Sequence, residues 1–164
     1  MESNKQQMLS LVIPVFNEQE VLKDSFARMD AAMQSTGYAY EIIYINDGSR
    51  DQTLAQLREL AKEHPQVKVL SFSRNFGHQL AVTCGMDAAK GDALIIIDVD
   101  LQDPPELIPE MVRMWEAGAD IVYGKRVKRK GETLFKKLTA SLYYRLLSWM
   151  SAYPIPLDTG DFRL

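Results

Sequence analysis

The 164-residue sequence contains a single cysteine, Cys84, which excludes an intrachain disulfide and favours a reducing compartment. No apolar run approaches the roughly 20 residues that a membrane-spanning helix needs, so any membrane contact is predicted to be peripheral. Neither G-x-G-x-x-G nor G-x-x-x-x-G-K-[ST] occurs, so a phosphate-bearing ligand is not expected on a glycine-rich loop. A net charge of -3 argues against a general nucleic-acid binder.

Positive charge is concentrated in one part of this otherwise acidic chain. Residues 125–137, which we call the basic segment, hold seven basic residues and one acidic residue, a local charge of +6, so the rest of the chain carries -9. Such a distribution predicts a localised anionic partner rather than a diffuse one. The length and the hydrophobic content of 46% are those of one domain with a real core.

Five short apolar segments alternate with longer segments of helical periodicity. The short segments are rich in Val and Ile and apolar on both faces, as in a parallel sheet that is covered by helices. They are residues 9–16, 41–45, 67–72, 93–97 and 121–123. The alternation predicts an α/β fold, an open, doubly wound, mostly parallel sheet with helices on both faces.

The predicted helices begin and end near residues that favour caps. Three pairs have the spacing of a capping box, namely Asn17 with Glu20, Ser49 with Gln52, and Asp103 with Glu106. We therefore expect Asn17, Ser49 and Asp103 to cap helices. Gly91 and Gly118 follow predicted helix ends, where a glycine C-cap is expected. Residues 132–150 form a predicted amphipathic helix, whose apolar face suits either the core or a membrane interface.

Polar residues follow all five predicted strands. In open α/β sheets, ligands bind beyond the carboxyl ends of the strands. The strand exits read Asn17-Glu18, Asn46-Asp47-Gly48-Ser49, Arg74-Asn75, Asp98-Val99-Asp100 and Lys125-Arg126. One of them, Asn46-Asp47-Gly48, would pass alone as a simple turn. Five polar exits at one edge favour a binding site.

Asp98 and Asp100 are candidate ligands of a divalent cation. They lie two residues apart at the end of a predicted strand, and an extended backbone would place both carboxylates on the same side. Hard oxygen ligands suit Mg²⁺ or Mn²⁺, with the phosphates of a ligand completing the shell. An isolated D-x-D is more often a pair of solvated loop acids. His64 and His78 have no partners in sequence, and neither is a convincing ligand.

Five ordered motifs resemble those of the family 2 glycosyltransferases, and the match extends from Leu9 to the last residue. The motifs are residues 12–18 (VIPVFNE), 45–49 (INDGS), 74–77 (RNFG), 98–104 (DVDLQDP) and 160–163 (GDFR). The sequence is most similar to the polyprenyl-phosphate branch, which comprises dolichol-phosphate mannosyltransferases and bactoprenol glucosyltransferases. The resemblance implies the A-type glycosyltransferase fold.

The resemblance also implies a site for a nucleotide-sugar donor. The residues expected to bind the donor are Pro14, Phe16, Glu18, Asn46, Asp47, Arg74 and Asp98. Those expected to hold Mg²⁺ or Mn²⁺ on its diphosphate are Asp98, Asp100 and Gln102. Asn46 replaces the first member of the family's acidic pair, which leaves open whether Asn46 or Asp47 meets the base.

The acceptor implied by the resemblance is a polyprenyl phosphate. Its second pKa is near 6, so it is largely anionic at neutral pH and needs cations rather than a strong base. Arg126, Lys128, Arg129, Lys130, Lys136 and Lys137 supply cations, of which Arg126 and Lys137 are the catalytic candidates. Asp161 is expected to orient the acceptor or to act as base. The alternative for the basic segment is a solvated loop.

The sequence therefore predicts a metal-dependent inverting glycosyltransferase. It would move a hexose, glucose by resemblance, from a UDP-sugar to a polyprenyl phosphate at the cytoplasmic face of the bacterial inner membrane. Residues 1–164 are expected to form one catalytic domain that lacks the C-terminal membrane helices of relatives and binds the membrane surface peripherally. The alternatives are a non-catalytic remnant that binds nucleotide sugar, and a nucleotidyltransferase or phosphatase. Aspartyl-phosphate phosphatases carry D-x-D after the first strand rather than the fourth.

Overall fold

The computed structural model describes residues 7–125 and 159–164. The chain divides into two compact units, Met1–Tyr123 with Asp161–Leu164, and Gly124–Gly160. The fold below is that of the first unit and of the described residues 124–125 and 159–160, which adjoin it in the chain. The basic segment from residue 126 onward, with Arg126 and Lys137, and the predicted helix 132–150 lie outside the described residues. That residues 1–164 act as one catalytic domain stays a prediction.

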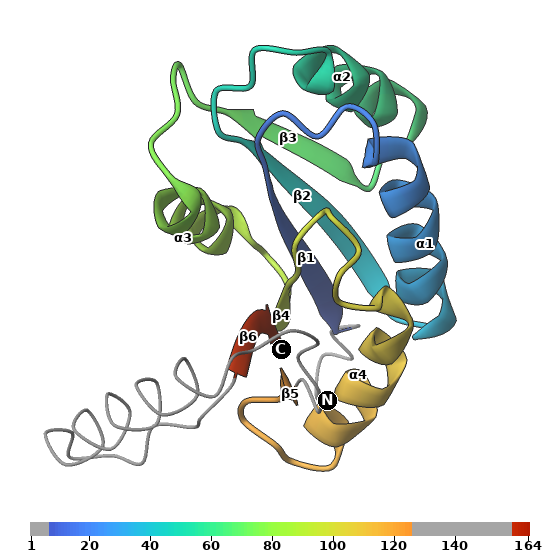
Figure 1. Cartoon of the computed structure of the whole chain (residues 1–164). Coiled ribbons are helices and arrows are strands. Elements are labelled where there is room, and N and C mark those ends of the chain that lie inside the picture. The colour runs from blue at the N-terminus through green and yellow to red at the C-terminus, as the bar shows by residue number, and fades with distance from the viewer. Residues whose placement is uncertain (1–6, 126–158) are drawn as a thin grey trace, which may run out of the picture. The chain divides into compact units, whose positions relative to one another are not determined.

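The strands form one sheet of six, in the order β3-β2-β1-β4-β6-β5 (Figure 1). They are β1 (Met8–Val15), β2 (Ala39–Asn46), β3 (Val67–Ser71), β4 (Ala93–Ile96), β5 (Tyr123–Lys125) and β6 (Thr159–Arg163). β1 pairs in parallel with β2 and β4, and β2 with β3. The predicted mostly parallel sheet is confirmed.

β6 is a strand that the sequence did not predict. It pairs antiparallel with β4, with Arg163 opposite Ile96, and reciprocal backbone hydrogen bonds of 2.7 Å join Leu164 to Val122. Its sequence, TGDFR, has Gly and Asp at its centre, residues that are depleted in strands. Its strand conformation therefore comes from pairing with β4 rather than from local propensity.

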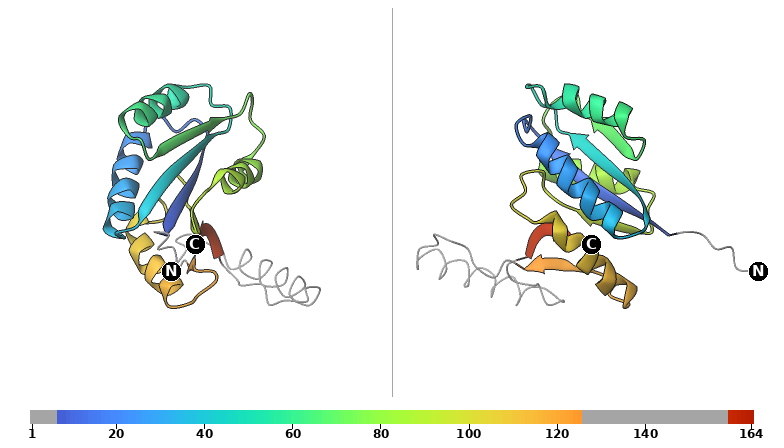
Figure 2. Two further views of the ribbon diagram at one scale, coloured as in Figure 1. Left: turned by 180° about the vertical axis from the view of Figure 1, so that it is seen from behind. Right: turned by 90° about the vertical axis from the view of Figure 1, so that its right-hand side faces the viewer.

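Helices cover both faces of the sheet, as predicted. The helices are α1 (Leu22–Ser35), α2 (Thr53–Glu63), α3 (His78–Ala88) and α4 (Ile108–Glu116), with a short 3-10 helix, η1 (Pro105–Leu107), before α4. α3 lies on one face, and α1 and α4 on the other (Figures 1 and 2). Alternate residues of β1 point to opposite faces of the sheet. Leu11 packs with the α1 and α4 side chains, whereas Val12 packs with Ala81 of α3.

The predicted side-chain caps at Asn17 and Ser49 are wrong. α1 begins at Leu22 and α2 at Thr53, and neither has a side-chain cap bond within the described residues. Asn17 has a φ of 56°, and its Oδ1 accepts a hydrogen bond of 2.8 Å from the Arg50 amide. The Asn17 amide in turn donates to Ser49 Oγ at 3.0 Å. These side chains join the loops after β1 and β2 instead of starting helices.

The third predicted cap is also wrong, because α4 begins at Ile108, five residues after Asp103, and is preceded by η1. The Gly118 prediction is confirmed. Gly118 has a φ of 98°, and its amide and that of Ala119 bond the last carbonyls of α4 in a Schellman motif. Gly91 is no such cap, since α3 ends at Ala88 with Ala89 as its C-cap and Gly91 is not among the glycines with a positive φ. Among the described residues, no helix is long and apolar enough to cross a membrane.

Candidate functional site

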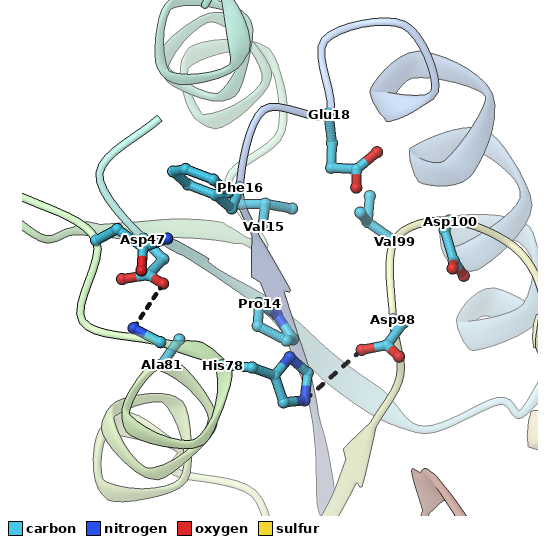
Figure 3. A pocket seen from close by; sticks show the side chains of 12 residues that line it. Pro14, Val15, Phe16, Glu18, Asp47, His78, Ala81, Asp98, Val99 and Asp100 are labelled. Carbon is cyan, nitrogen blue, oxygen red and sulfur yellow. Dashed lines mark hydrogen bonds and ion pairs between the residues drawn. The ribbon is translucent and has the colours of Figure 1, made fainter. Parts of the chain in front are cut away.

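A cavity of about 420 Å³ lies beyond the carboxyl ends of β1 and β4 (Figure 3). The strand order changes direction here, because β2 and β3 follow on one side of β1 and β4 on the other. Open α/β sheets bind ligands at this switch point. The described lining residues are Pro14, Val15, Phe16, Glu18, Asp47, Asn75, Gly77, His78, Ala81, Asp98, Val99 and Asp100.

The cavity opens because β1 and β4 stop pairing before β1 ends. Their register runs to Val12 opposite Ile96, and the last bond between them joins the Ile97 amide to the Val12 carbonyl at 3.2 Å. The backbone of Pro14, two residues after Val12, faces β4 as the backbone of Val12 does. It has no N–H to leave unpaired, so a proline is tolerated where the ladder ends. The two strands can therefore separate at this point without leaving an unpaired N–H on Pro14.

Six of the predicted site residues are brought together in this cavity. Pro14, Phe16 and Glu18 come from the end of β1 and its following loop, Asp47 from the exit of β2, and Asp98 and Asp100 from the exit of β4. The Phe16 ring is 41% exposed. Residues from three separate exits thus line one space, although the roles assigned to them remain predictions.

Three other predicted residues, all with described side chains, lie outside the described lining. Asn46 is buried, and its amide donates to Ser71 Oγ at 2.9 Å while its Oδ1 accepts from the Ser49 amide at 3.2 Å. The Arg74 guanidinium stacks 4.2 Å from the centre of the Phe76 ring. Gln102 is exposed, and its backbone N–H donates to Asp100 Oδ1 at 3.0 Å. Asp161 belongs to β6, and its side chain is not among those described.

The loop after β2 holds the loop that leads into α3. Asp47 is only 3% exposed, and its two carboxylate oxygens accept hydrogen bonds from the Phe76 amide at 2.7 Å and the Gly77 amide at 2.9 Å. Gly48 has a φ of 68° and lies so close to this loop that a Cβ on it would be 2.3 Å from the Arg74 carbonyl carbon. Asp47 and Gly48 therefore shape one wall of the cavity.

Carboxylates dominate the charge of the cavity. Burial, and after it the negative charges of Asp100, Asp51 and Asp98, raise the pKa of the Glu18 carboxyl above its ordinary value. Asp98 is about one third exposed, and Asp100 is exposed. Negative groups that disfavour one another's ionisation are stabilised when a cation binds among them.

The donor set fits a hard divalent cation that the protein shares with a ligand. Within the described ranges, no group of three or more His, Cys, Asp or Glu side chains is placed to hold a metal by itself. Mg²⁺ in proteins commonly takes one or two carboxylates together with substrate phosphates, and Asp98 and Asp100 can supply the carboxylates. The other oxygen ligands of the cation would have to come from the bound ligand.

The expected geometry of the D-x-D motif is wrong. β4 ends at Ile96, and residues 98–100 belong to a turn region in which Leu101 has a φ of 59°. The extended-strand argument therefore does not apply, although both carboxylates line the cavity. Figure 3 shows the Asp98 carboxylate directed toward His78, whereas the Asp100 carboxylate points in a different direction.

His78 is a lining residue that sequence reasoning missed. Its Nε2 lies 3.9 Å from Asp98 Oδ1. It is the first residue of α3, and it follows the polar exit of β3 by only three residues. The first turn of a helix that leaves a binding edge faces that edge, and this signal could have identified it. His64, by contrast, packs on the Phe26 ring at 4.5 Å between ring centres.

The model of the family described as Glycosyl transferase family 2 matches residues 10–164. An uncharacterised glycosyltransferase of Bacillus subtilis is 54% identical over 155 residues, which are 94% of this chain and 48% of the relative. A bactoprenol glucosyl transferase of Shigella phage SfV is 45% identical over 156 residues, 95% of this chain and 51% of the relative. The chain thus spans about half the length of these curated relatives.

Solved structures share the fold at lower identity. A glucosyl-3-phosphoglycerate synthase of Mycobacterium tuberculosis, solved with Mn²⁺, UDP and phosphoglyceric acid, has a TM-score of 0.67 and 22% identity over 96% of this chain and 55% of that one. A Pyrobaculum calidifontis mannosyltransferase, solved with GDP-Man and Mn²⁺, has a TM-score of 0.61 and 20% identity over 77% of this chain and 37% of that one.

Proposed function

The chain belongs to glycosyl transferase family 2 and has the A-type fold of that group, and we propose that it binds a UDP-hexose and transfers the hexose, with inversion, to a polyprenyl phosphate. Support for the acceptor comes from the bactoprenol glucosyl transferase of the Shigella phage, a relative that is 45% identical. The same name supports glucose as the sugar. Support for a nucleoside diphosphate comes from the UDP and GDP-Man bound to the two structural relatives.

The observation that carries the proposal is the cavity at the switch point of the sheet. It brings the exits of β1, β2 and β4 together and lines them with Phe16, Asp47 and Asp98, among others. The half-exposed Phe16 ring offers a flat apolar surface for a base. The carboxylates at the other end of the cavity suit a metal-bound diphosphate. One site can thus hold both ends of a nucleotide diphosphate.

Asp98 and Asp100 would hold Mg²⁺ or Mn²⁺ against the diphosphate. The bound cation supplies neutralisation of the charge that develops on the departing nucleoside diphosphate. Without it, two carboxylates facing a diphosphate would repel the donor. The backbone N–H of Gln102 donates a hydrogen bond to the Asp100 carboxylate. Gln102 would hold that carboxylate in position or join it as a ligand of the cation.

The acceptor side of the proposal rests on residues that the structure does not describe or describes only in backbone. Arg126 and Lys137 would collect the lipid phosphate, with arginine providing a bidentate grip and lysine a point charge. Asp161 would orient the acceptor or take up its remaining proton. Association with the cytoplasmic membrane surface would follow from the attraction of the basic segment to anionic lipids.

Calorimetry with UDP tests the donor site. We expect UDP to bind in Mn²⁺ and to lose most of its affinity in EDTA. Asp100→Asn keeps the shape but removes one charged ligand, so it should weaken binding in Mn²⁺ without lowering the melting temperature. Asp24→Asn, an equal change of charge on the exposed side of α1, is the matched control. Equal UDP binding in EDTA and Mn²⁺, or wild-type binding by Asp100→Asn, would show that the metal site is misassigned.

A turnover assay tests the reaction itself. UDP-glucose and a water-soluble, short-chain prenyl phosphate should yield UDP and glucosyl-phospho-prenol in the presence of Mn²⁺. Arg126→Ala should raise the acceptor KM or lower kcat while it spares UDP affinity. Tight UDP binding without turnover would favour the alternative of a non-catalytic protein that binds nucleotide sugar.

A further inference from the structure

The described wall of the cavity contains one side chain that can carry positive charge, His78. The other ionisable side chains of that wall are the carboxylates of Glu18, Asp47, Asp98 and Asp100. A nucleoside diphosphate would add more negative charge to this space. A single cation shared with the protein would contact only some of the phosphate oxygens. The remaining oxygens need hydrogen-bond donors.

The position of His78 is determined by the contacts that shape the same wall. The residue before it, Gly77, has a φ of 100°, and its backbone N–H donates a hydrogen bond to Asp47 Oδ2 at 2.9 Å. This bond anchors the start of α3 to the exit of β2. Figure 3 shows the His78 ring projecting from α3 below Pro14 and toward the Asp98 carboxylate. The imidazole is thus held at the side of the cavity where the diphosphate is proposed to lie.

The distance between His78 and Asp98 suits a ligand oxygen that touches both. The 3.9 Å between Nε2 and Oδ1 is longer than a direct hydrogen bond, which joins such atoms at about 2.7–3.2 Å. Oxygens that share one small divalent cation lie about 3 Å apart, because each sits at about 2.1 Å from it. The spacing therefore leaves room for a phosphate oxygen that shares a cation with Asp98 to lie within hydrogen-bond distance of Nε2 as well.

We propose that His78 is a further donor-binding residue, whose Nε2–H donates a hydrogen bond to an oxygen of the second phosphate of the nucleotide diphosphate, beside Asp98. The proposal rests on the proposed function, because it requires a nucleoside diphosphate in this cavity. This contact would make His78 a specificity-determining residue, because it strengthens the binding of nucleotides that carry a second phosphate and does not involve the base or the ribose. A neutral imidazole suffices, because the contact needs the N–H and not the charge.

The experiment compares UDP with UMP by calorimetry in Mn²⁺. His78→Phe keeps a ring but removes the donor, and His78→Gln keeps an N–H donor of similar reach. Gln79→Ala is the matched control, because Gln79 is the next residue of α3, is exposed and is absent from the described lining. We expect His78→Phe to weaken UDP binding about tenfold or more, with UMP binding within about twofold of the wild type. His78→Gln should recover part of the loss, and Gln79→Ala should behave as wild type.

Three results would overturn the proposal. Equal losses of UDP and UMP affinity in His78→Phe, or no loss at all, would show that the imidazole does not contact the second phosphate. Weaker Mn²⁺ binding by His78→Phe without nucleotide would show that His78 acts through Asp98 instead. Failure of the wild type to bind UDP would instead contradict the proposed function itself, so the two failures are distinguishable. If His78→Phe does not fold, the UDP and UMP affinities of His78→Gln decide the matter.

Discussion

Gly48→Ala tests whether the loop after β2 shapes the cavity. Gly48 has a φ of 68°, in the left-handed region, and a Cβ there would lie 2.3 Å from the Arg74 carbonyl carbon and 2.6 Å from the Asn75 nitrogen. Both atoms belong to the backbone, so no side chain can rotate to make room. The segment that carries Asn75, Gly77 and His78 into the cavity would have to move.

A second glycine separates the two effects of this substitution. Gly37 has a φ of 76°, but no described atom lies within 4 Å of the Cβ that alanine would add. Gly37→Ala therefore meets only the cost of a left-handed alanine, about 1–2 kcal/mol. Gly48→Ala meets the same cost plus overpacking of about 1–3 kcal/mol, a total of about 2–5 kcal/mol. The difference between the two variants measures the close approach.

Urea denaturation and UDP calorimetry provide the readouts. Both variants should unfold at lower urea than the wild type, Gly48→Ala at the lower concentration of the two. Gly37→Ala should bind UDP in Mn²⁺ as the wild type does, because Gly37 follows α1 and lies outside the described lining. Gly48→Ala should lose affinity even at temperatures where it is fully folded. Equal destabilisation of the two variants, with normal UDP binding by both, would refute the reasoning.

Three further predictions concern the core, pH and the membrane. The buried Tyr44 hydroxyl has no hydrogen-bond partner among the described residues, so Tyr44→Phe should leave the urea-derived free energy of unfolding unchanged or raise it by up to about 1 kcal/mol. A clear loss would reveal a partner. Burial alone would raise the pKa of Glu41, but hydrogen bonds from Lys68, Ser10 and the Lys90 amide together lower it below its ordinary 4.5. That stabilisation is present above pH 4.5 and is lost as the pH falls through the lowered pKa, so wild type should lose more stability than Glu41→Gln over that window. Liposomes with anionic lipid should retain the protein at low salt and release it as salt screens the basic segment, and equal retention on neutral liposomes at high salt would contradict an electrostatic contribution.

Local sequence patterns were sufficient for the main elements of the fold. Residues 67–72 and 93–97 were predicted as strands because they are short, mainly apolar runs between segments of helical periodicity, and they correspond to β3 (Val67–Ser71) and β4 (Ala93–Ile96). The polar exits of these strands were readable for the same reason, since the point where an apolar run stops is local information. The chain order of the motifs then indicated the family, which the match over residues 10–164 shows.

Side-chain partners could not be read from the sequence, because they depend on which loops meet in space. Asn17 and Ser49 had the spacing of helix caps, yet they bond each other's loops, 32 residues apart. His78 had no sequence neighbour that marked it as functional, and its approach to Asp98 exists only because α3 and β4 converge on the switch point. The sequence by itself located the strand exits that line the cavity, since burial and periodicity are local. Only the tertiary structure decided which of them face one another across the cavity, because strand order and loop contacts bring together residues that are distant along the chain.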